Sequence, residues 1–180
     1  AAVTQSGFPP AALERMESWG AAMMLLGAQF VDLGLKVDQG VETVLHEEFT
    51  KSGRPIGELE TNVEQFGFFD RLPEKAQRAL LESTIEPNSE VRSDFAAMLD
   101  AWTSGDVGKL DKAFNEDLAD APELLDGLLY QRNANWTAWI KRRLDQPGTI
   151  IVAVGAGHLA GRKSVVDLLG RDGVKVRRIQ

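Results

Sequence analysis

The sequence predicts an α/β fold that is mostly helical, with a small parallel sheet that includes a C-terminal βαβ unit. Apolar residues recur at helical spacing in several segments, the longest of which is residues 122–144. A continuous β-branched run at residues 149–154 is typical of a strand buried on both faces. Residues 174–179 alternate between apolar and polar side chains, as an edge strand does.

Composition narrows the class of protein. The chain has 180 residues, enough for a hydrophobic core, and residues 1–180 are predicted to form a single domain. A net charge of −7 argues against nucleic acid or an anionic membrane as the main partner. Because cysteine is absent, disulfides, thiolate metal sites and cysteine nucleophiles are excluded. The apolar stretch at residues 20–31 is too short for a membrane span.

The first third of the chain is predicted to be helical with one strand. Residues 9–33 begin with a Pro-Pro pair, which favours a helix start. Four apolar residues of this segment share one helical stripe: Trp19, Met23, Leu26 and Phe30. A second helix is predicted from Val41 to Lys51, ending at Gly53. Residues 55–60 alternate in polarity and predict a short strand.

A capping box follows this strand, because the Thr61 hydroxyl and the Glu64 carboxylate have the spacing of an N-cap pair. Glu60 is therefore expected at the carboxyl end of a strand, one residue before a helix. Further helices are predicted at residues 73–82 and 88–102. The second of these has one apolar face, formed by Val91, Phe95, Met98, Leu99 and Trp102.

Two more helices precede the β-branched run. The Ser-Gly-Asp sequence at residues 104–106 separates a short helix at residues 107–118 from the helix before it. The helix predicted at residues 122–144 has one apolar face, formed by Leu125, Leu128, Leu129, Trp136, Trp139 and Ile140. Arg132 lies in the same stripe, so its guanidinium needs a carboxylate or several acceptors.

The C-terminal segment has the order strand, glycine-rich turn, helix and strand. The strands are residues 149–154 and 174–179, the turn is residues 155–161, and the helix is residues 164–169. A right-handed crossover would place the two strands side by side in parallel.

His158 is the sharpest candidate for chemistry, because parallel sheets bind ligands in turns that follow a strand. Gly155 and Gly157 would let a substrate approach the backbone closely. The alternative is a histidine that only hydrogen-bonds a neighbouring backbone group. A further alternative is dinucleotide binding, because residues 155–160 fit the G-x-G-x-x-[GA] pattern. Too little chain follows this motif to build the rest of a dinucleotide-binding half-sheet.

Three other residues are candidates, each with a structural alternative. Glu60 has the same location as His158, at the end of a predicted strand, or it is a solvated carboxylate at a helix N-terminus. Arg132 positions a carboxylate ligand or closes a structural ion pair. Asn133 hydrogen-bonds the same site or caps a loop. His46 is excluded from a zincin motif because no second histidine follows at i+4.

Four segments, in order along the chain, resemble the TraB/GumN family, which is related to the Tiki proteins. They are Gly53 to Thr61 with Gln65, Ala101 to Asp106, Arg132-Asn133 with Trp136, and the Gly155 to Gly161 turn, which resembles the family's second G-x-x-H motif. The resemblance implies a metal-dependent hydrolase, with peptidase activity proposed for the Tiki branch, acting on a peptide or small molecule. It implies that His158, Glu60 and Arg132 are catalytic and that His158 and Glu60 ligate a divalent metal ion. It also implies that Asn133 contributes to substrate binding.

The family's first G-x-x-H motif has no counterpart here, and the resemblance places it before Ala1. We therefore expect the C-terminal portion of a longer protein, with half a site, no bound metal and no activity by itself. The family implies an extracytoplasmic, periplasmic location, with a cytoplasmic one left open. The alternative function is a non-catalytic helical binding module, which an acidic surface and four tryptophans suit equally well.

Overall fold

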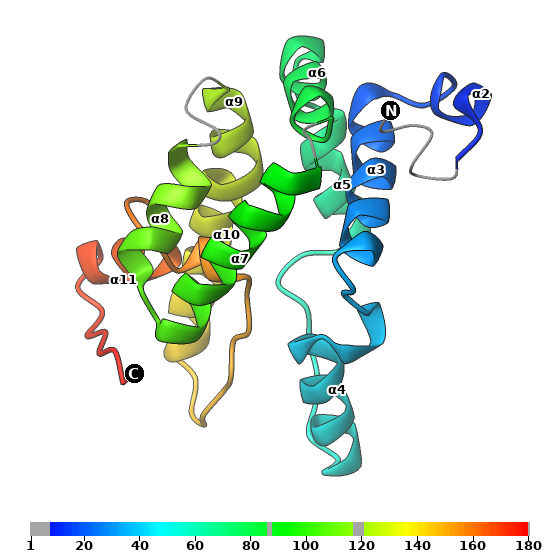
Figure 1. The fold of residues 1–180 in the computed structure, drawn as a ribbon. Helices are drawn as coiled ribbons and strands as arrows, with labels where there is room; N and C mark the ends of the chain where they lie inside the picture. The colour runs from blue at the N-terminus through cyan, green and yellow to red at the C-terminus, as the bar shows by residue number, and fades with distance from the viewer. Residues whose placement is uncertain (1–7, 86–87, 117–120, 180) are drawn as a thin grey trace. The chain divides into compact units, whose positions relative to one another are not determined.

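The computed structural model describes residues 8–85, 88–116 and 121–179, and the regular secondary structure within these ranges is helical (Figure 1). The chain divides into two compact units, Ala1–Pro87 and Asn88–Gln180, and each is described by itself. The single domain predicted for residues 1–180 stays a prediction. None of the described helices combines the length and the apolarity needed to cross a membrane.

The first unit is built around the packing of two helices, α3 and α6. Its elements are α2 (Pro10–Leu13), α3 (Ser18–Asp32), the 3₁₀ turn η1 (Val37–Gln39), α4 (Val41–Lys51), α5 (Asn62–Asp70) and α6 (Glu74–Ser83). Its buried apolar residues are Ala21, Ala22, Leu25, Phe68, Leu72, Ala76 and Leu80. The side-chain amide of Gln29 also donates to the carbonyl of Thr84 at 2.9 Å, which ties the end of α3 to the end of α6.

Two predicted helices of this unit are confirmed at their ends. Helix α4 spans the predicted residues, and Gly53 follows it in a left-handed conformation. The capping box of α5 is complete: the backbone N–H of Thr61 donates to the Glu64 carboxylate at 2.7 Å, and the backbone N–H of Glu64 donates to the Thr61 hydroxyl at 3.2 Å. These hydrogen bonds lower the pKa of Glu64.

The single helix predicted for residues 9–33 is wrong, because the chain leaves the helix between α2 and α3. The predicted stripe is not the buried face either. Its last member, Phe30, is 49% exposed, whereas Ala21, Ala22 and Leu25 are buried. Small side chains allow close helix packing, while the ring of Trp19 stacks on aromatic rings of α5.

The second unit contains α7 (Asn88–Ser104), α8 (Val107–Glu116), α9 (Pro122–Leu125), the π-helical turn η2 (Asp126–Tyr130), α10 (Gln131–Leu144), the 3₁₀ turn η3 (Ala156–His158) and α11 (Val165–Arg171). Helix α7 packs on α8, α8 on η3, and α10 on α11. One core cluster joins Ala101, Leu110 and Ala160. The helix predicted at residues 107–118 is described as far as Glu116, and residues 117–118 lie outside the described residues.

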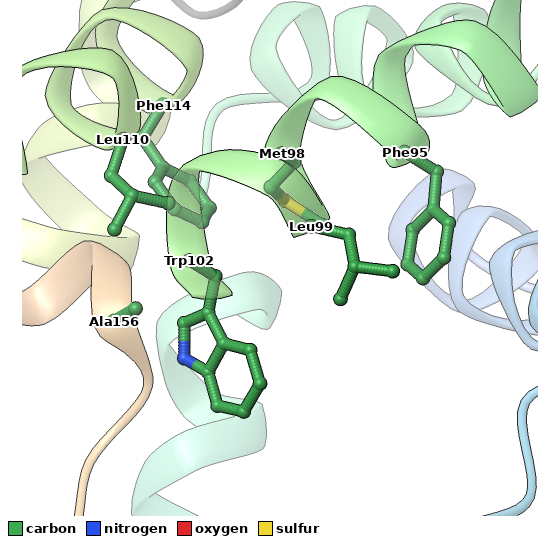
Figure 2. A pocket seen from close by; sticks show the side chains of 7 residues that line it. All are labelled: Phe95, Met98, Leu99, Trp102, Leu110, Phe114 and Ala156. Atoms are coloured by element: carbon green, nitrogen blue, oxygen red, sulfur yellow. The ribbon is translucent and has the colours of Figure 1, made fainter. Parts of the chain in front are cut away.

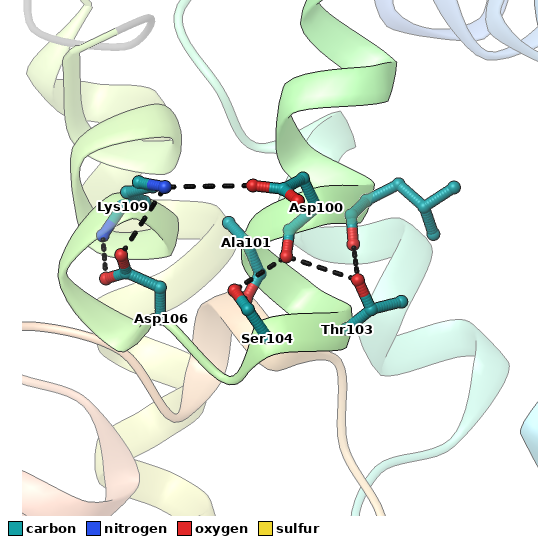
Figure 3. Close-up of polar contacts among 7 residues, drawn as sticks. Asp100, Ala101, Thr103, Ser104, Asp106 and Lys109 are labelled. Carbon is teal, nitrogen blue, oxygen red and sulfur yellow. Dashed lines mark hydrogen bonds and ion pairs between the residues drawn. The ribbon is translucent and has the colours of Figure 1, made fainter.

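The turn between α7 and α8 gives the Trp-Thr-Ser-Gly-Asp segment a structural role (Figure 3). Gly105 has a φ of +68°, and the N–H of Asp106 donates to the carbonyl of Ala101 at 2.8 Å, which together end α7 in a Schellman motif. The Asp106 carboxylate then accepts from the backbone N–H of Lys109 at 3.0 Å. This segment therefore serves to end one helix and begin the next.

The predicted parallel sheet and its βαβ unit are wrong, because no strand occurs within residues 8–85, 88–116 and 121–179. Residues 55–60, 149–154 and 174–179 carry no regular secondary structure. Ile151 is 63% exposed, so its segment is not buried on both faces. Runs of β-branched residues favour an extended backbone, but a strand also needs a neighbour about 4.8 Å away to share its hydrogen bonds.

Candidate functional site

The site centres on His158, the last residue of η3, whose side chain is 9% exposed. Its Nδ1 atom lies 2.7 Å from Oδ1 of Asn133, which α10 supplies. Its ring also lies against Trp136, with ring centroids 4.4 Å apart at 48°. The glycine-rich turn and α10 therefore meet at this imidazole.

A second hydrogen bond joins Asn133 to the start of α11. The Nδ2 group of Asn133, a residue that is 2% exposed, donates to the carbonyl of Lys163 at 2.9 Å. Lys163 has a φ of +59° and is the non-glycine residue with positive φ in the described part of the chain. This conformation costs an L-residue about 1–2 kcal/mol, and strain of this kind clusters at functional sites. Lys163 could not be found from the sequence, because no residue pattern signals a left-handed lysine.

Arg132 lies one residue before Asn133 and is half-buried. Its Nη1 donates to the carbonyl of Leu128 at 3.1 Å, and its guanidinium carbon is 4.9 Å from the centre of the Trp136 ring. A backbone carbonyl and an aromatic face are therefore two partners of this guanidinium, for which the sequence predicted a carboxylate or several acceptors. The π-helical turn η2 ends directly before α10. Such a turn holds one more residue than an α-turn, so it rotates the face of the helix that follows, and π-turns are frequent at functional sites.

The imidazole of His158 is electrically neutral at pH 7. Burial, and secondly the positive charge of Arg132, lower the pKa of His158 from 6.5 to about 4. Neutral imidazole is the form that binds a metal ion or accepts a proton. The site can therefore offer a nitrogen lone pair without first releasing a proton.

The two glycines before His158 differ in their surroundings. A Cβ atom on Gly157 would lie 3.1 Å from ring atoms of Phe114, so α8 packs directly against this backbone. A Cβ atom on Gly155 would make an ordinary contact, 3.7 Å from Cδ2 of His158. The close approach at Gly157 is thus to a neighbouring helix, and substrate binding by both glycines stays a prediction.

Glu60 lies in the first unit, half-buried and directly before the capping box of α5. The strand that would have placed it at a sheet edge is absent from the described residues. Arg132, Asn133 and His158 lie together in the second unit. The meeting of Glu60 with these residues stays a prediction.

The described residues supply one good metal ligand and no complete site. His158 fits an imidazole ligand, since it is neutral and one of its ring nitrogens is held by a side-chain amide. Among residues 8–85, 88–116 and 121–179, however, no three histidine, aspartate or glutamate side chains are grouped so that they could hold a metal ion.

An apolar pocket of about 250 Å³ lies beside the histidine turn (Figure 2). It is lined by Phe95, Met98, Leu99 and Trp102 from α7, Leu110 and Phe114 from α8, and Ala156 from η3. Four of the five side chains of the predicted apolar face of α7 therefore line this pocket, and one of them, Trp102, is 53% exposed. Ala156 lies two residues before His158 in the sequence, so the pocket adjoins the turn that carries the histidine.

The chain matches the TraB/PrgY/gumN family over residues 1–178. It is similar to "Uncharacterized protein YbaP" of Escherichia coli (strain K12), with 28% identity over 165 residues, which are 92% of this chain and 61% of YbaP. The protein of the same name from Shigella flexneri matches with the same identity and coverage. The match thus spans 61% of the length of these relatives. No solved structure matches the chain.

Proposed function

The chain belongs to the TraB/PrgY/gumN family, and from that premise we propose that the whole protein is a metal-dependent hydrolase in which His158 is one metal ligand. The observation that carries this proposal is the buried imidazole, which is neutral at pH 7. Metal ions compete with protons for imidazole nitrogens, so a lowered pKa keeps His158 ready to bind a metal at neutral pH.

A catalytic zinc takes three protein ligands and keeps one open position. Such a metal, when bound, lowers the pKa of a water molecule and polarises a carbonyl group. The described residues do not form that ligand set. We propose Glu60 as an acidic ligand or general base, with the remaining ligands from sequence outside this chain.

Arg132 has a role in this proposal through its charge. Its guanidinium is close enough to lower the pKa of His158, and it is held by the Leu128 carbonyl and the Trp136 ring. A fixed positive charge of this kind orients a carboxylate or stabilises negative charge that develops during hydrolysis. We propose a peptide as substrate and an extracytoplasmic location for the reaction, both on the basis of the family resemblance.

The test uses the full-length protein, with whatever sequence precedes Ala1 and follows Gln180. Binding of Zn²⁺, Mn²⁺ and Co²⁺ is measured by calorimetry, and cleavage is measured on a set of peptides and esters. We expect His158→Ala to weaken metal binding at least tenfold and to reduce cleavage in parallel. The matched control is His46→Ala, which removes an exposed histidine of α4 and should change neither quantity. Unchanged metal affinity and turnover in His158→Ala would reject the proposal.

A second candidate function is non-catalytic binding of a peptide, and the apolar pocket beside η3 favours it. Its volume of about 250 Å³ is below the usual range for a drug-sized ligand, so it suits one large apolar side chain. Trp102 provides a reporter at the edge of this pocket. A phenylalanine-containing peptide should quench or shift Trp102 fluorescence without added metal, and Trp102→Phe should remove that signal. Binding with no cleavage under any metal would favour this candidate over the hydrolase.

A further inference from the structure

We propose that Asn133 is a positioning residue that holds His158 in the tautomer with its proton on Nδ1, in an orientation dictated by the backbone carbonyl of Lys163. The hydrogen bonds among these three residues carry the inference. Its consequence, that Nε2 is the nitrogen presented to a metal or a substrate, rests on the proposed function.

The partners of Asn133 determine the orientation of its side-chain amide. An asparagine side chain ends in an oxygen that accepts and an NH₂ group that donates, and the two have almost the same shape. The carbonyl of Lys163 can only accept, so the group 2.9 Å from it must be the NH₂ group. The oxygen of Asn133 is then turned towards His158.

The Asn133 oxygen determines which ring nitrogen of His158 carries the proton. Oδ1 of Asn133 can only accept, so Nδ1 of His158, 2.7 Å away, must carry the proton. A neutral imidazole has one N–H group, and Nε2 therefore holds the lone pair. Histidines that bind metals commonly donate their other N–H to such an outer partner, which determines both tautomer and ring orientation.

The backbone around Lys163 holds its carbonyl in place. The left-handed conformation of Lys163 sets the direction of this group. The residue is anchored on both sides: its N–H donates to the Asp167 carboxylate at 2.8 Å, and Ser164 caps α11 by accepting from the N–H of Asp167 at 3.1 Å. Since α10 and α11 pack on each other, the orientation of Asn133 is supported by two helices.

NMR of the histidine ring nitrogens tests this inference. Assignment is simple because the 180-residue chain has two histidines, His46 and His158. Long-range ¹H–¹⁵N NMR spectra at pH 7 distinguish a protonated from an unprotonated ring nitrogen. We expect a protonated Nδ1 and an unprotonated Nε2 at His158, with the exposed His46 as the internal reference. Asn133→Leu removes the acceptor and should shift His158 away from this tautomer.

Two results would overturn the inference. The first is a wild-type spectrum in which His158 carries its proton on Nε2 or exchanges between both tautomers, and this result does not depend on any variant folding. The second is an unchanged tautomer in Asn133→Leu, which would make Asn133 merely structural. The spectra need neither metal nor substrate. A full-length protein that binds no metal would thus reject the proposed function and leave this inference standing.

Discussion

His158 and Asn133 form a buried hydrogen-bonded pair, with 2.7 Å between Nδ1 and Oδ1. The two side chains are 9% and 2% exposed, so little water reaches either of them. A buried neutral imidazole with a hydrogen-bond partner is tolerated, but a buried imidazolium beside a guanidinium is unfavourable. The folded state therefore resists protonation of His158.

Because the folded state disfavours protonation of His158, acid should lower the free energy of unfolding of the metal-free chain. The folded-state pKa is about 4 against 6.5 for an unperturbed histidine, so between these values the unfolded chain binds a proton that the folded chain does not. The contribution of His158 to the free energy of unfolding is complete above pH 6.5 and is lost as the pH falls towards 4. We expect a loss of about 2 kcal/mol between pH 7 and pH 5.

Urea unfolding at the two pH values measures this loss. His158→Gln lacks the titrating group, so its unfolding free energy should fall less over the same interval. His46→Gln should fall as much as the wild type. Equal pH dependence in the wild type and His158→Gln would contradict the prediction.

Alanine should destabilise the chain at Gly157 and leave its stability nearly unchanged at Gly155. In Gly157→Ala the new methyl group meets the Phe114 ring at 3.1 Å, and we expect a loss of about 1–3 kcal/mol in the free energy of unfolding. Gly155→Ala has room at 3.7 Å and should change stability by less than about 0.5 kcal/mol. Denaturant unfolding of both variants checks this, and equal losses would mean that α8 does not constrain the turn.

Because Lys163 has a left-handed backbone conformation, glycine should be more stable than alanine at this position, which is the reverse of the order within a helix. Both Lys163→Ala and Lys163→Gly remove the ammonium group that lies 4.3 Å from the Tyr130 ring. Only glycine adopts a φ of +59° without strain, so the glycine variant should be more stable by about 1 kcal/mol. At Ala97, an exposed position within α7, glycine should instead be less stable than alanine by about 1 kcal/mol. The same order at both positions would exclude strain at Lys163.

The helices of the chain were largely predictable, because their signals are local. Gly53 and the Thr61–Glu64 capping box mark helix ends through backbone rules that operate over a few residues. The sheet predicted from the run at residues 149–154 was wrong, because strand pairing depends on a distant neighbour and not on β-branched composition. His158 was found by its position after that run, although the strand itself is absent from the described residues.

The candidate site was only partly predictable, for a related reason. The sequence shows Asn133 one residue after Arg132, but their different roles depend on how α10 is rotated by η2 and on where Lys163 lies. Neither a π-helical turn nor a left-handed lysine has a sequence pattern as clear as a capping box. The cost of an unpaired charge predicted a carboxylate or several acceptors for Arg132. The structure gives its guanidinium the Leu128 carbonyl and the Trp136 ring, and a carboxylate partner stays a prediction.

The last prediction separates the two causes of the low pKa of His158. Burial is the larger cause and the charge of Arg132 is the smaller, so Arg132→Met should raise the pKa of His158 while leaving it below 6.5. NMR titration of the ring protons measures this shift directly. Arg142→Met is the matched control, because Arg142 is exposed on the same helix and its removal should leave the pKa unchanged. If Arg132→Met also left the pKa unchanged, burial alone would keep the imidazole neutral. Arg132 would then have no electrostatic influence on the nitrogen that the proposed metal site uses.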